Sequence, residues 1–106
     1  MGYTAPVEIV KSATFDAWLS GLRDRQARAR AQVRITRLAL GNPGDVQPVG
    51  EGISEMRIHY GPGYRVYYLE CRASEIVLLC GGTKATQKAD IERAREIARE
   101  WRGRRI

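Results

Sequence analysis

The sequence predicts an α+β fold: a small antiparallel β-sheet with an N-terminal helical hairpin and a C-terminal helix packed on one side of it. Apolar residues recur at helical spacing over residues 14–40 and 87–101, whereas residues 53–80 show the alternation and β-branched content of strands. The turn-forming run Asn42-Pro43-Gly44-Asp45 separates the two patterns. With 106 residues, the chain has the size of one domain, residues 1–106.

The N-terminal half carries the start and stop signals of two helices. Residues 7–10 are apolar and β-branched, which predicts a short first strand. Ser12 or Thr14 can cap a short helix, and Asp24 can cap a second helix, which Gly41 stops in the left-handed conformation. Because the connection between the helices is minimal, we expect an antiparallel hairpin.

The C-terminal half carries the strand signals. Residues 46–49 are expected to form an edge strand, because Pro48 cannot donate to a central ladder. Further strands are predicted at 53–60, 64–70 and 75–80, followed by a helix at 87–101. The predicted order is therefore β-α-α-β-β-β-α.

The hairpin over residues 53–70 determines which side chains share a face. If Gly61-Pro62-Gly63 forms a three-residue loop, His59 lies opposite Arg65, and Arg57 lies opposite Tyr67. Alternation then directs one set of side chains to the core: Met56, Ile58, Tyr60, Tyr64, Val66 and Tyr68. The other face, which we expect to be open, carries Glu55, Arg57, His59, Arg65 and Tyr67.

Charge indicates what this open face binds. The net charge is +6, most of the eighteen basic residues are arginine, and a guanidinium can bind a phosphate with two parallel hydrogen bonds. Lys84 follows the strand at 75–80 in a loop freed by Gly81 and Gly82, so we expect Arg57, Arg65 and Lys84 to contact one phosphate backbone. The basic balance favours a nucleic acid and, after that, an acidic protein partner. The alternative is that arginine merely replaces lysine on solvated helix faces.

Other classes of protein receive little support. Histidine and cysteine do not occur at metal-ligand spacing, and we expect no metal and no cofactor. The longest apolar run, residues 76–80, is too short for a bilayer, and residues 1–6 lack the features of a secretion signal. Cys71 and Cys80 lie near opposite ends of one predicted strand, too far apart for a disulfide. These observations predict a cytoplasmic protein with reduced thiols.

Several segments, in order, resemble one known family. They are Phe15-Asp16-Ala17-Trp18-Leu19, Gly41-Asn42-Pro43-Gly44-Asp45, Tyr60-Gly61-Pro62-Gly63-Tyr64-Arg65-Val66-Tyr67-Tyr68 and Leu78-Leu79-Cys80-Gly81-Gly82-Thr83-Lys84. Together they resemble the RelE/ParE superfamily of bacterial toxins, and most closely its HigB-like, phage-derived branch of addiction module killer proteins. The resemblance covers nearly the whole chain.

The resemblance implies the toxin of a type II toxin–antitoxin module. Such a toxin is neutralised by a cognate antitoxin, in this branch usually a helix-turn-helix DNA-binding protein. It acts as an mRNA interferase, an endoribonuclease that cuts mRNA on the ribosome, inhibits translation and uses the RNA 2′-hydroxyl as nucleophile. Carried over by position, the basic catalytic residues are Arg57, Arg65 and Lys84.

The remaining candidate residues come from the residues themselves. His59 is the one histidine, and as the side chain that exchanges protons near neutral pH it is a candidate base, or else a solvated strand residue. Arg65 can alternatively form an ion pair with Glu55 or Glu70. Candidate RNA contacts are Arg30, Arg34 and Arg37 on the second helix, unless these are simply solvated, and Tyr67, which could stack on a base.

Two further functions stay open. Relatives often carry a catalytic Tyr or His near the C-terminus, whereas residues 101–106 contain neither, so the resemblance leaves the general base unassigned. One alternative is a ParE-like toxin that inhibits DNA gyrase by binding. The other is a catalytically inert relative that only binds its antitoxin.

Overall fold

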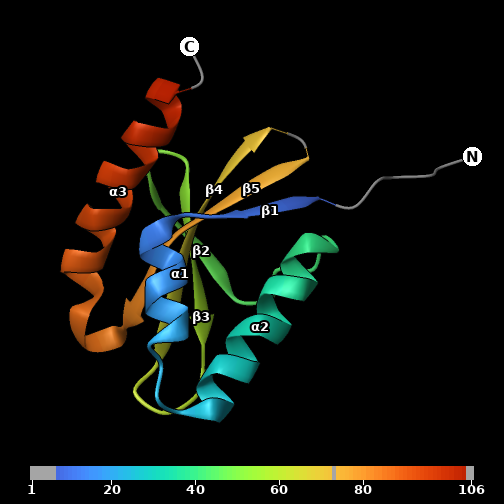
Figure 1. Ribbon diagram of the computed structural model, residues 1–106, viewed down its shortest axis with the longest axis vertical. Coiled ribbons are helices and arrows are strands. Elements are labelled where there is room, and N and C mark those ends of the chain that lie inside the picture. The colour runs from blue at the N-terminus through green and yellow to red at the C-terminus, as the bar shows by residue number, and fades with distance from the viewer. Residues whose placement is uncertain (1–6, 73, 105–106) are drawn as a thin grey trace, which may run out of the picture.

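The computed structural model describes residues 7–72 and 74–104, and it contains every predicted element (Figure 1). The expectation for residues 1–6 lies outside the described residues. The elements in chain order are β1 (Glu8–Lys11), α1 (Ala13–Ser20), α2 (Arg25–Ala39), β2 (Val46–Gly50), β3 (Ile53–Ile58), β4 (Tyr64–Arg72), β5 (Glu75–Thr83), the 3-10 turn η1 (Lys84–Thr86) and α3 (Gln87–Arg104). The predicted α+β class is confirmed.

The five strands form one sheet in the order β1-β5-β4-β3-β2. Neighbouring strands run antiparallel except β1, which pairs parallel with β5, so the sheet is mixed rather than wholly antiparallel as predicted. Ser12 fixes the parallel edge. Its backbone N–H donates to the Leu78 carbonyl at 3.0 Å, and its hydroxyl donates to the Leu79 carbonyl at 2.6 Å.

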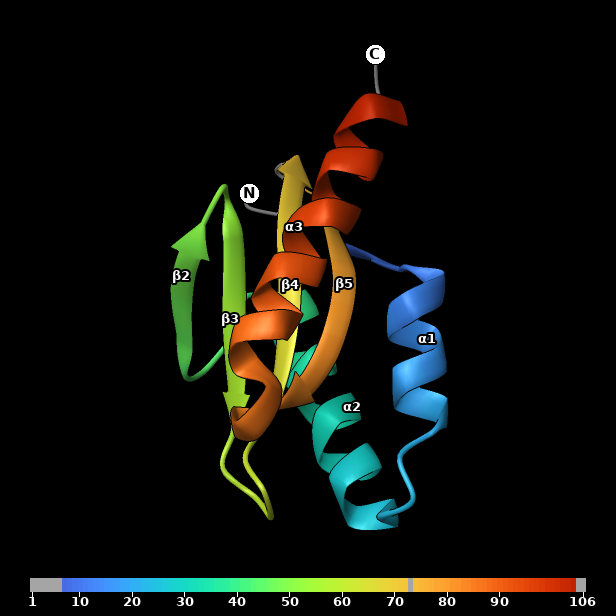
Figure 2. The ribbon, with the colours of Figure 1, turned by 90° about the vertical axis from the view of Figure 1, so that its left-hand side faces the viewer.

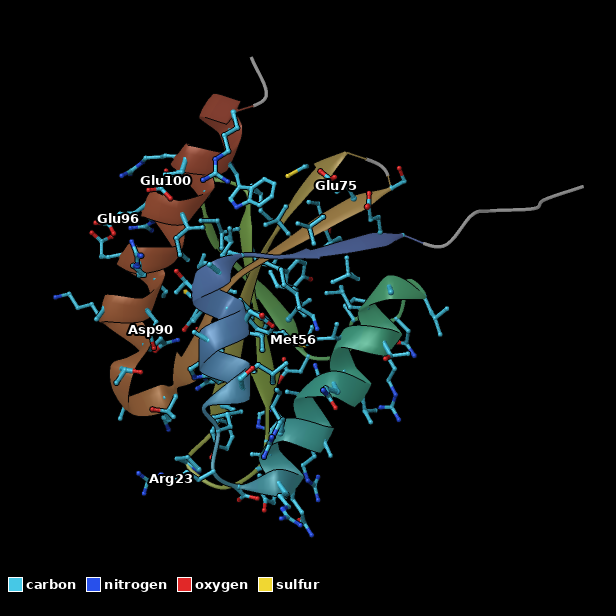
Figure 3. The ribbon with its side chains drawn as sticks, viewed as in Figure 1. Arg23, Met56, Glu75, Asp90, Glu96 and Glu100 are labelled. Carbon is cyan, nitrogen blue, oxygen red and sulfur yellow. The ribbon has the colours of Figure 1, made fainter. Side chains whose placement is uncertain are left out.

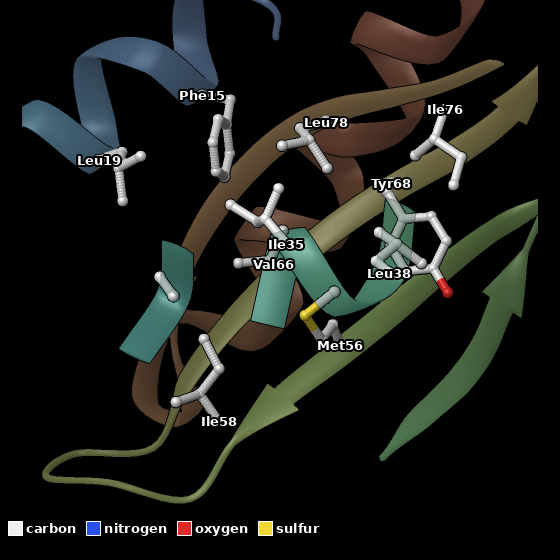
Figure 4. Close-up of a cluster of buried hydrophobic side chains, with 11 residues drawn as sticks. Phe15, Leu19, Ile35, Leu38, Met56, Ile58, Val66, Tyr68, Ile76 and Leu78 are labelled. Carbon is white, nitrogen blue, oxygen red and sulfur yellow. The ribbon is translucent and has the colours of Figure 1, made fainter. Parts of the chain in front are cut away.

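Helices cover both faces of the sheet, which corrects the prediction that they pack on one side. Helices α1 and α2 close a first core, seen in Figure 4, that includes Phe15, Ile35 and Met56. Helix α3 closes a second core on the opposite face with Tyr67 and Ile97. Figure 2 shows α3 in front of the strands and α2 behind them. The second layer forms because the supposedly open face of β4 and β5 is itself apolar over much of its length.

Polar caps position both N-terminal helices. The Ser12 hydroxyl accepts a hydrogen bond from the Phe15 N–H, so Ser12 rather than Thr14 is the first N-cap. Asp24 accepts from the backbone N–H groups at positions 26 and 27, as predicted. Gly41 follows the second helix with φ +85°, the left-handed conformation that glycine adopts freely. The caps thus set where each helix begins and ends.

The hairpin between β3 and β4 differs from its predicted register by two residues. Arg57 lies directly opposite Arg65, and Glu55 lies opposite Tyr67, because residues 59–63 form the loop. The loop is longer because Tyr60 is drawn toward α2, where its hydroxyl donates to Asp24 at 2.9 Å. A shift of two residues preserves the facing of each side chain, so the predicted division into two faces holds within the strands.

The remaining sequence expectations concern membranes and cysteines. Within residues 7–72 and 74–104, no helix is both long and apolar enough to cross a bilayer. Cys71, on β4, and Cys80, on β5, are free thiols. Burial raises the pKa of the Cys80 thiol to about 12, so this thiol packs as a small apolar group.

Candidate functional site

The candidate site lies on the face of β3 and β4 that is covered by the start of α3. The hairpin register places the Cα atoms of Arg57 and Arg65 directly opposite each other. Glu55 and Tyr67 form the next pair on the same face, and Gln87 reaches them from the first residue of α3. We call these five residues the arginine site. Its two cations come together because side chains on neighbouring strands share a face at each paired position.

A buried carboxylate, that of Glu55, lies at the centre of the arginine site. It is fully buried and accepts hydrogen bonds from Arg57 Nε at 3.0 Å, from the Tyr67 hydroxyl at 2.9 Å and from Gln87 Nε2 at 2.8 Å. Burial alone would raise the pKa of Glu55. The three hydrogen bonds, together with the nearby charge of Arg65, lower the pKa below its ordinary value. Glu55 is therefore an ionised internal partner for the two arginines.

Arg65 is recessed and incompletely paired. Only 8% of its surface is exposed, and its buried Nε has no hydrogen-bond partner among the described residues. Its other cross-strand neighbour is Gly82 on β5. A Cβ atom on Gly82 would lie 1.8 Å from Asp90 Oδ2, so the missing side chain is what lets α3 approach the sheet here. Figure 3 shows Asp90 near the start of α3.

Arg57 forms the more accessible edge of the site. Its Nε is bound to Glu55, and its NH2 donates to Gln47 Oε1 on β2 at 3.2 Å. The side chain remains 28% exposed. The Glu55 ion pair that the sequence left open for Arg65 is therefore formed by Arg57 instead, and Arg65 acts on Glu55 through its nearby charge.

Lys84 lies at the tip of the hairpin. Its backbone N–H donates to the Gly63 carbonyl at 2.8 Å, which fastens the start of η1 to the loop. The Lys84 side chain is exposed, and no ion pair holds it within the described part of the chain. Its ammonium group is therefore a free cation beside the strands that carry the two arginines.

His59 follows the last paired residue of β3 and is held by an acid. Its Nε2 lies 2.6 Å from Asp45 Oδ2, in the residue just before β2, and both side chains are exposed. The hydrogen bond to His59 is the main reason that the pKa of Asp45 is lowered. Asp45 thus orients one ring nitrogen of His59 and leaves the other, Nδ1, without a contact in the described structure.

The predicted RNA contacts separate into different roles. Tyr67 is fully buried, so the prediction that it stacks on a base is wrong. Burial and its hydrogen bond to Glu55 raise its pKa. Arg34 is half-buried and donates to the Arg57 and Pro43 carbonyls at 2.6 and 3.0 Å, which gives it a structural role. Its neighbours Arg30 and Arg37 stay exposed on α2.

Sequence reasoning missed the polar partners of the cations. Glu55 was expected on the same face as Arg57, but its burial and its bond to Arg57 were not, because both depend on α3 covering that face. Nothing in the local sequence marked Gln87 or Asp45, since each acts across a distance of many residues. No group of three or more His, Cys, Asp or Glu side chains in the described ranges could hold a metal ion.

The fold and the site together define a small basic α+β domain with a recessed arginine pair. The structure is similar to one chain of the toxin–antitoxin complex RelBE2 from Mycobacterium tuberculosis, with a TM-score of 0.57 at 20% identity, covering 76% of this chain and 100% of that chain. At that identity the likeness concerns the fold.

Sequence comparison gives the family. The family model described as phage derived protein Gp49-like matches residues 17–102, so the chain belongs to the phage-derived, Gp49-like family. An uncharacterized protein of Haemophilus influenzae is 46% identical over 94 residues, which span 89% of this chain and 95% of that protein.

Proposed function

We propose that this protein is the toxin of a type II toxin–antitoxin module, of the HigB-like kind, and that it acts in the cytoplasm as a ribosome-dependent mRNA endoribonuclease. The phage-derived family and the RelE-like fold support the toxin role. The arginine site supports RNA cleavage, because it concentrates fixed positive charge beside an exposed lysine.

The observation that carries the proposal is the direct opposition of Arg57 and Arg65. Like charges on directly paired strand positions destabilise a sheet, so the fold gains nothing from this pair. A buried carboxylate is needed to offset it, and Arg65 Nε still lacks a partner in the described structure. A costly, under-paired cation pair of this kind is typical of a site that meets an anion.

The chemistry follows from the charges. The 2′-oxygen of the ribose forms a bond to phosphorus while the bond from phosphorus to the 5′-oxygen of the next nucleotide breaks. The proton of the 2′-hydroxyl passes to a base, and a proton is delivered to the departing 5′-oxygen. Arg57, Arg65 and Lys84 stabilise the negative charge that grows on the phosphate oxygens, and a guanidinium does so at any cellular pH.

His59 is the proposed base, although it lines the groove beside α2 and not the α3-covered face that carries Arg57 and Arg65. Histidine exchanges protons near neutral pH, and the hydrogen bond to Asp45 would hold the ring with Nε2–H toward the carboxylate and Nδ1 free to accept a proton. This assignment fills the role for which residues 101–106 offer no tyrosine or histidine. The cations Arg57 and Arg34 lie near enough to Asp45 to lower its pKa further, which keeps that carboxylate ionised.

Lys84→Ala tests the proposal without disturbing the fold, because the Lys84 side chain is exposed and unpaired in the described structure. We expect purified protein incubated with ribosomes and mRNA to cut the transcript, and Lys84→Ala to lower the rate about 100-fold. The matched control is Lys88→Ala, which removes another exposed lysine, in the first turn of α3. Equal rates for both variants would contradict the proposal.

Arg65→Ala extends the test to the recessed cation. We expect Arg65→Ala to abolish cleavage and growth arrest, with thermal unfolding recorded to confirm that the variant folds. DNA damage without transcript loss would instead identify a gyrase inhibitor. We expect the adjacent reading frame to encode the helix-turn-helix antitoxin. If the protein binds this antitoxin but cuts no RNA, it is the inert relative.

A further inference from the structure

Helix α2 has a second apolar stripe that the protein core does not use. Its buried stripe consists of Ala27, Ala31, Ile35 and Leu38. On the opposite side a second stripe follows the spacing 4-3-4 and is apolar except for Thr36. It consists of Ala29, Val33, Thr36 and the C-cap residue Leu40, and we call it the outer seam. Val33 and Leu40 are 49% and 74% exposed, and they are the large exposed hydrophobic residues of the described chain. The spacing is that of one helix packing along another.

A groove runs beside the outer seam. A cavity of about 390 Å³ separates α2 from the end of β3, with Val33 and Ile58 on its apolar part and Arg30, Arg37 and His59 around it. A second hollow along α2 shares Val33 and Arg37 with the first. The two hollows flank Val33, so the seam and the groove form one continuous surface along the helix.

The charge of this surface has one sign. Helix α2 carries five arginines and no acidic residue over Arg25–Ala39. Arg30 lies over the Tyr60 ring at 4.5 Å but forms no ion pair within residues 7–72 and 74–104, and neither does Arg37. Unpaired cations beside an apolar stripe favour a partner with acidic residues that flank an apolar stripe of its own.

We propose that an acidic, amphipathic helix of the antitoxin docks along the outer seam and into the groove, an inference that rests on the proposed toxin function. Apolar residues of this helix at positions i, i+3, i+4 and i+7 pack on Val33 and Leu40, and its flanking carboxylates pair with Arg30 and Arg37. An apolar stripe offers nothing to a phosphate backbone, which is why the surface fits a peptide better than RNA. The bound helix also covers His59, the proposed base.

The test measures the affinity of the purified protein encoded by the adjacent reading frame, by isothermal titration calorimetry. We expect this protein to bind the wild-type toxin. Its affinity should fall at least about tenfold for Val33→Asp and for Arg37→Glu. Val33→Leu should bind with the wild-type affinity, because leucine preserves the apolar contact. The control is Arg93→Glu, which places the same charge change on an exposed position of α3. Circular dichroism verifies that each variant is folded.

Several results would overturn the proposal. The first is an unchanged affinity of Val33→Asp for the adjacent-frame protein. The second is an equal loss of affinity for Arg37→Glu and Arg93→Glu. The third is no binding of that protein by the wild-type toxin. If Arg37→Glu lowers affinity for a ribosomal RNA fragment while Val33→Asp leaves the adjacent-frame protein bound, the surface belongs to RNA. The binding measurement does not depend on RNA cleavage, so the docking proposal and the nuclease proposal can fail separately. If binding depends on the outer seam but the protein cuts no RNA, only the nuclease proposal is rejected.

Discussion

Individual residues in the arginine site carry a conflict between stability and binding. Arg57 and Arg65 repel each other across the two strands, and Glu55 offsets that repulsion through its bond to Arg57 and its charge near Arg65. Without the two arginines, the fold would not require a buried carboxylate at this position. Packing of the fold therefore does not explain why the cluster is present. The conflict is resolved with a buried polar network in which Tyr67 and Gln87 complete the coordination of the carboxylate.

Gly82→Ala tests the approach of α3 to the site. The added Cβ would lie 1.8 Å from Asp90 Oδ2 and 2.9 Å from Thr86 Oγ1, so the Asp90 side chain must leave its hydrogen bond to Thr86 or α3 must shift. We expect a loss of about 2 kcal/mol in the free energy of unfolding, together with slower RNA cleavage, because the cover over Arg65 moves. Denaturant unfolding measures the loss.

Gly103→Ala is the matched control. A Cβ atom at Gly103 meets nothing within 4 Å, and alanine is the better helix residue, so we expect stability unchanged or raised by a few tenths of a kcal/mol. If Gly82→Ala unfolded at the same denaturant concentration as wild type, the close packing described between β5 and α3 would be wrong.

At the scale of elements, α2 is held to the sheet by more than its apolar stripe. Arg34 donates to the carbonyl of Arg57 at the end of β3 and to the carbonyl of Pro43 in the turn before β2. One guanidinium thus joins the helix, the turn and the strand whose residue 57 belongs to the arginine site. The rigid position of α2 is what places the groove beside His59.

Arg34→Met tests this anchor. Methionine retains the apolar stem but loses the charged hydrogen bonds to three carbonyls, the third being that of Asp45 at 3.4 Å. We expect the free energy of unfolding to fall by about 2 kcal/mol, which for a chain of this size lowers the melting temperature by roughly 10 °C. Arg37→Met removes an exposed arginine from the same helix and should leave the melting temperature within about 2 °C of wild type. Equal melting temperatures for the two variants would show that Arg34 is dispensable.

The elements also show what the sequence could predict. Alternation along β3 and β4 depends only on local residue order, so the division into two faces held even though the register was displaced by two. The loop length was not predictable, because Tyr60 leaves the strand to reach Asp24 and Arg30 on another element. The caps at Ser12 and Asp24 were predictable for the opposite reason, since each bonds to residues within three positions.

At the scale of the whole molecule, the site is recessed because the sheet is covered on both faces. The prediction of one open face failed because it treated Arg57 and Arg65 as decisive. It therefore packed the apolar stripe of α3, which includes Ala94 and Ala98, on the same side of the sheet as α1 and α2. With α3 in place, the middle of that face becomes a second core, whereas Arg57 stays 28% exposed and Lys84 is exposed. The candidate site is therefore an edge of a buried polar cluster rather than an open platform.

The acid stability of the whole protein tests that cluster. Because the folded state lowers the pKa of Glu55, its contribution is fully present above the unfolded value of about 4.3 and is lost as pH falls through the folded value. We expect Glu55→Gln to be less stable than wild type by about 2 kcal/mol at pH 7, since two arginines then share the site without an anion.

The difference in free energy of unfolding between wild type and Glu55→Gln should narrow below about pH 4, where the Glu55 carboxylate of wild type is also neutralised. Urea unfolding at a series of pH values measures it, and Glu96→Gln on the outer side of α3 (Figure 3) is the control. The pKa values of Asp24 and Asp45 are also lowered, so the stability of both wild type and Glu55→Gln still falls in acid. A difference that stayed constant from pH 7 to about pH 3 would mean that folding does not shift the pKa of Glu55, and one that widened as the pH fell would mean that Glu55 is protonated in the folded protein. Either result would contradict the ionised internal partner described for the two arginines.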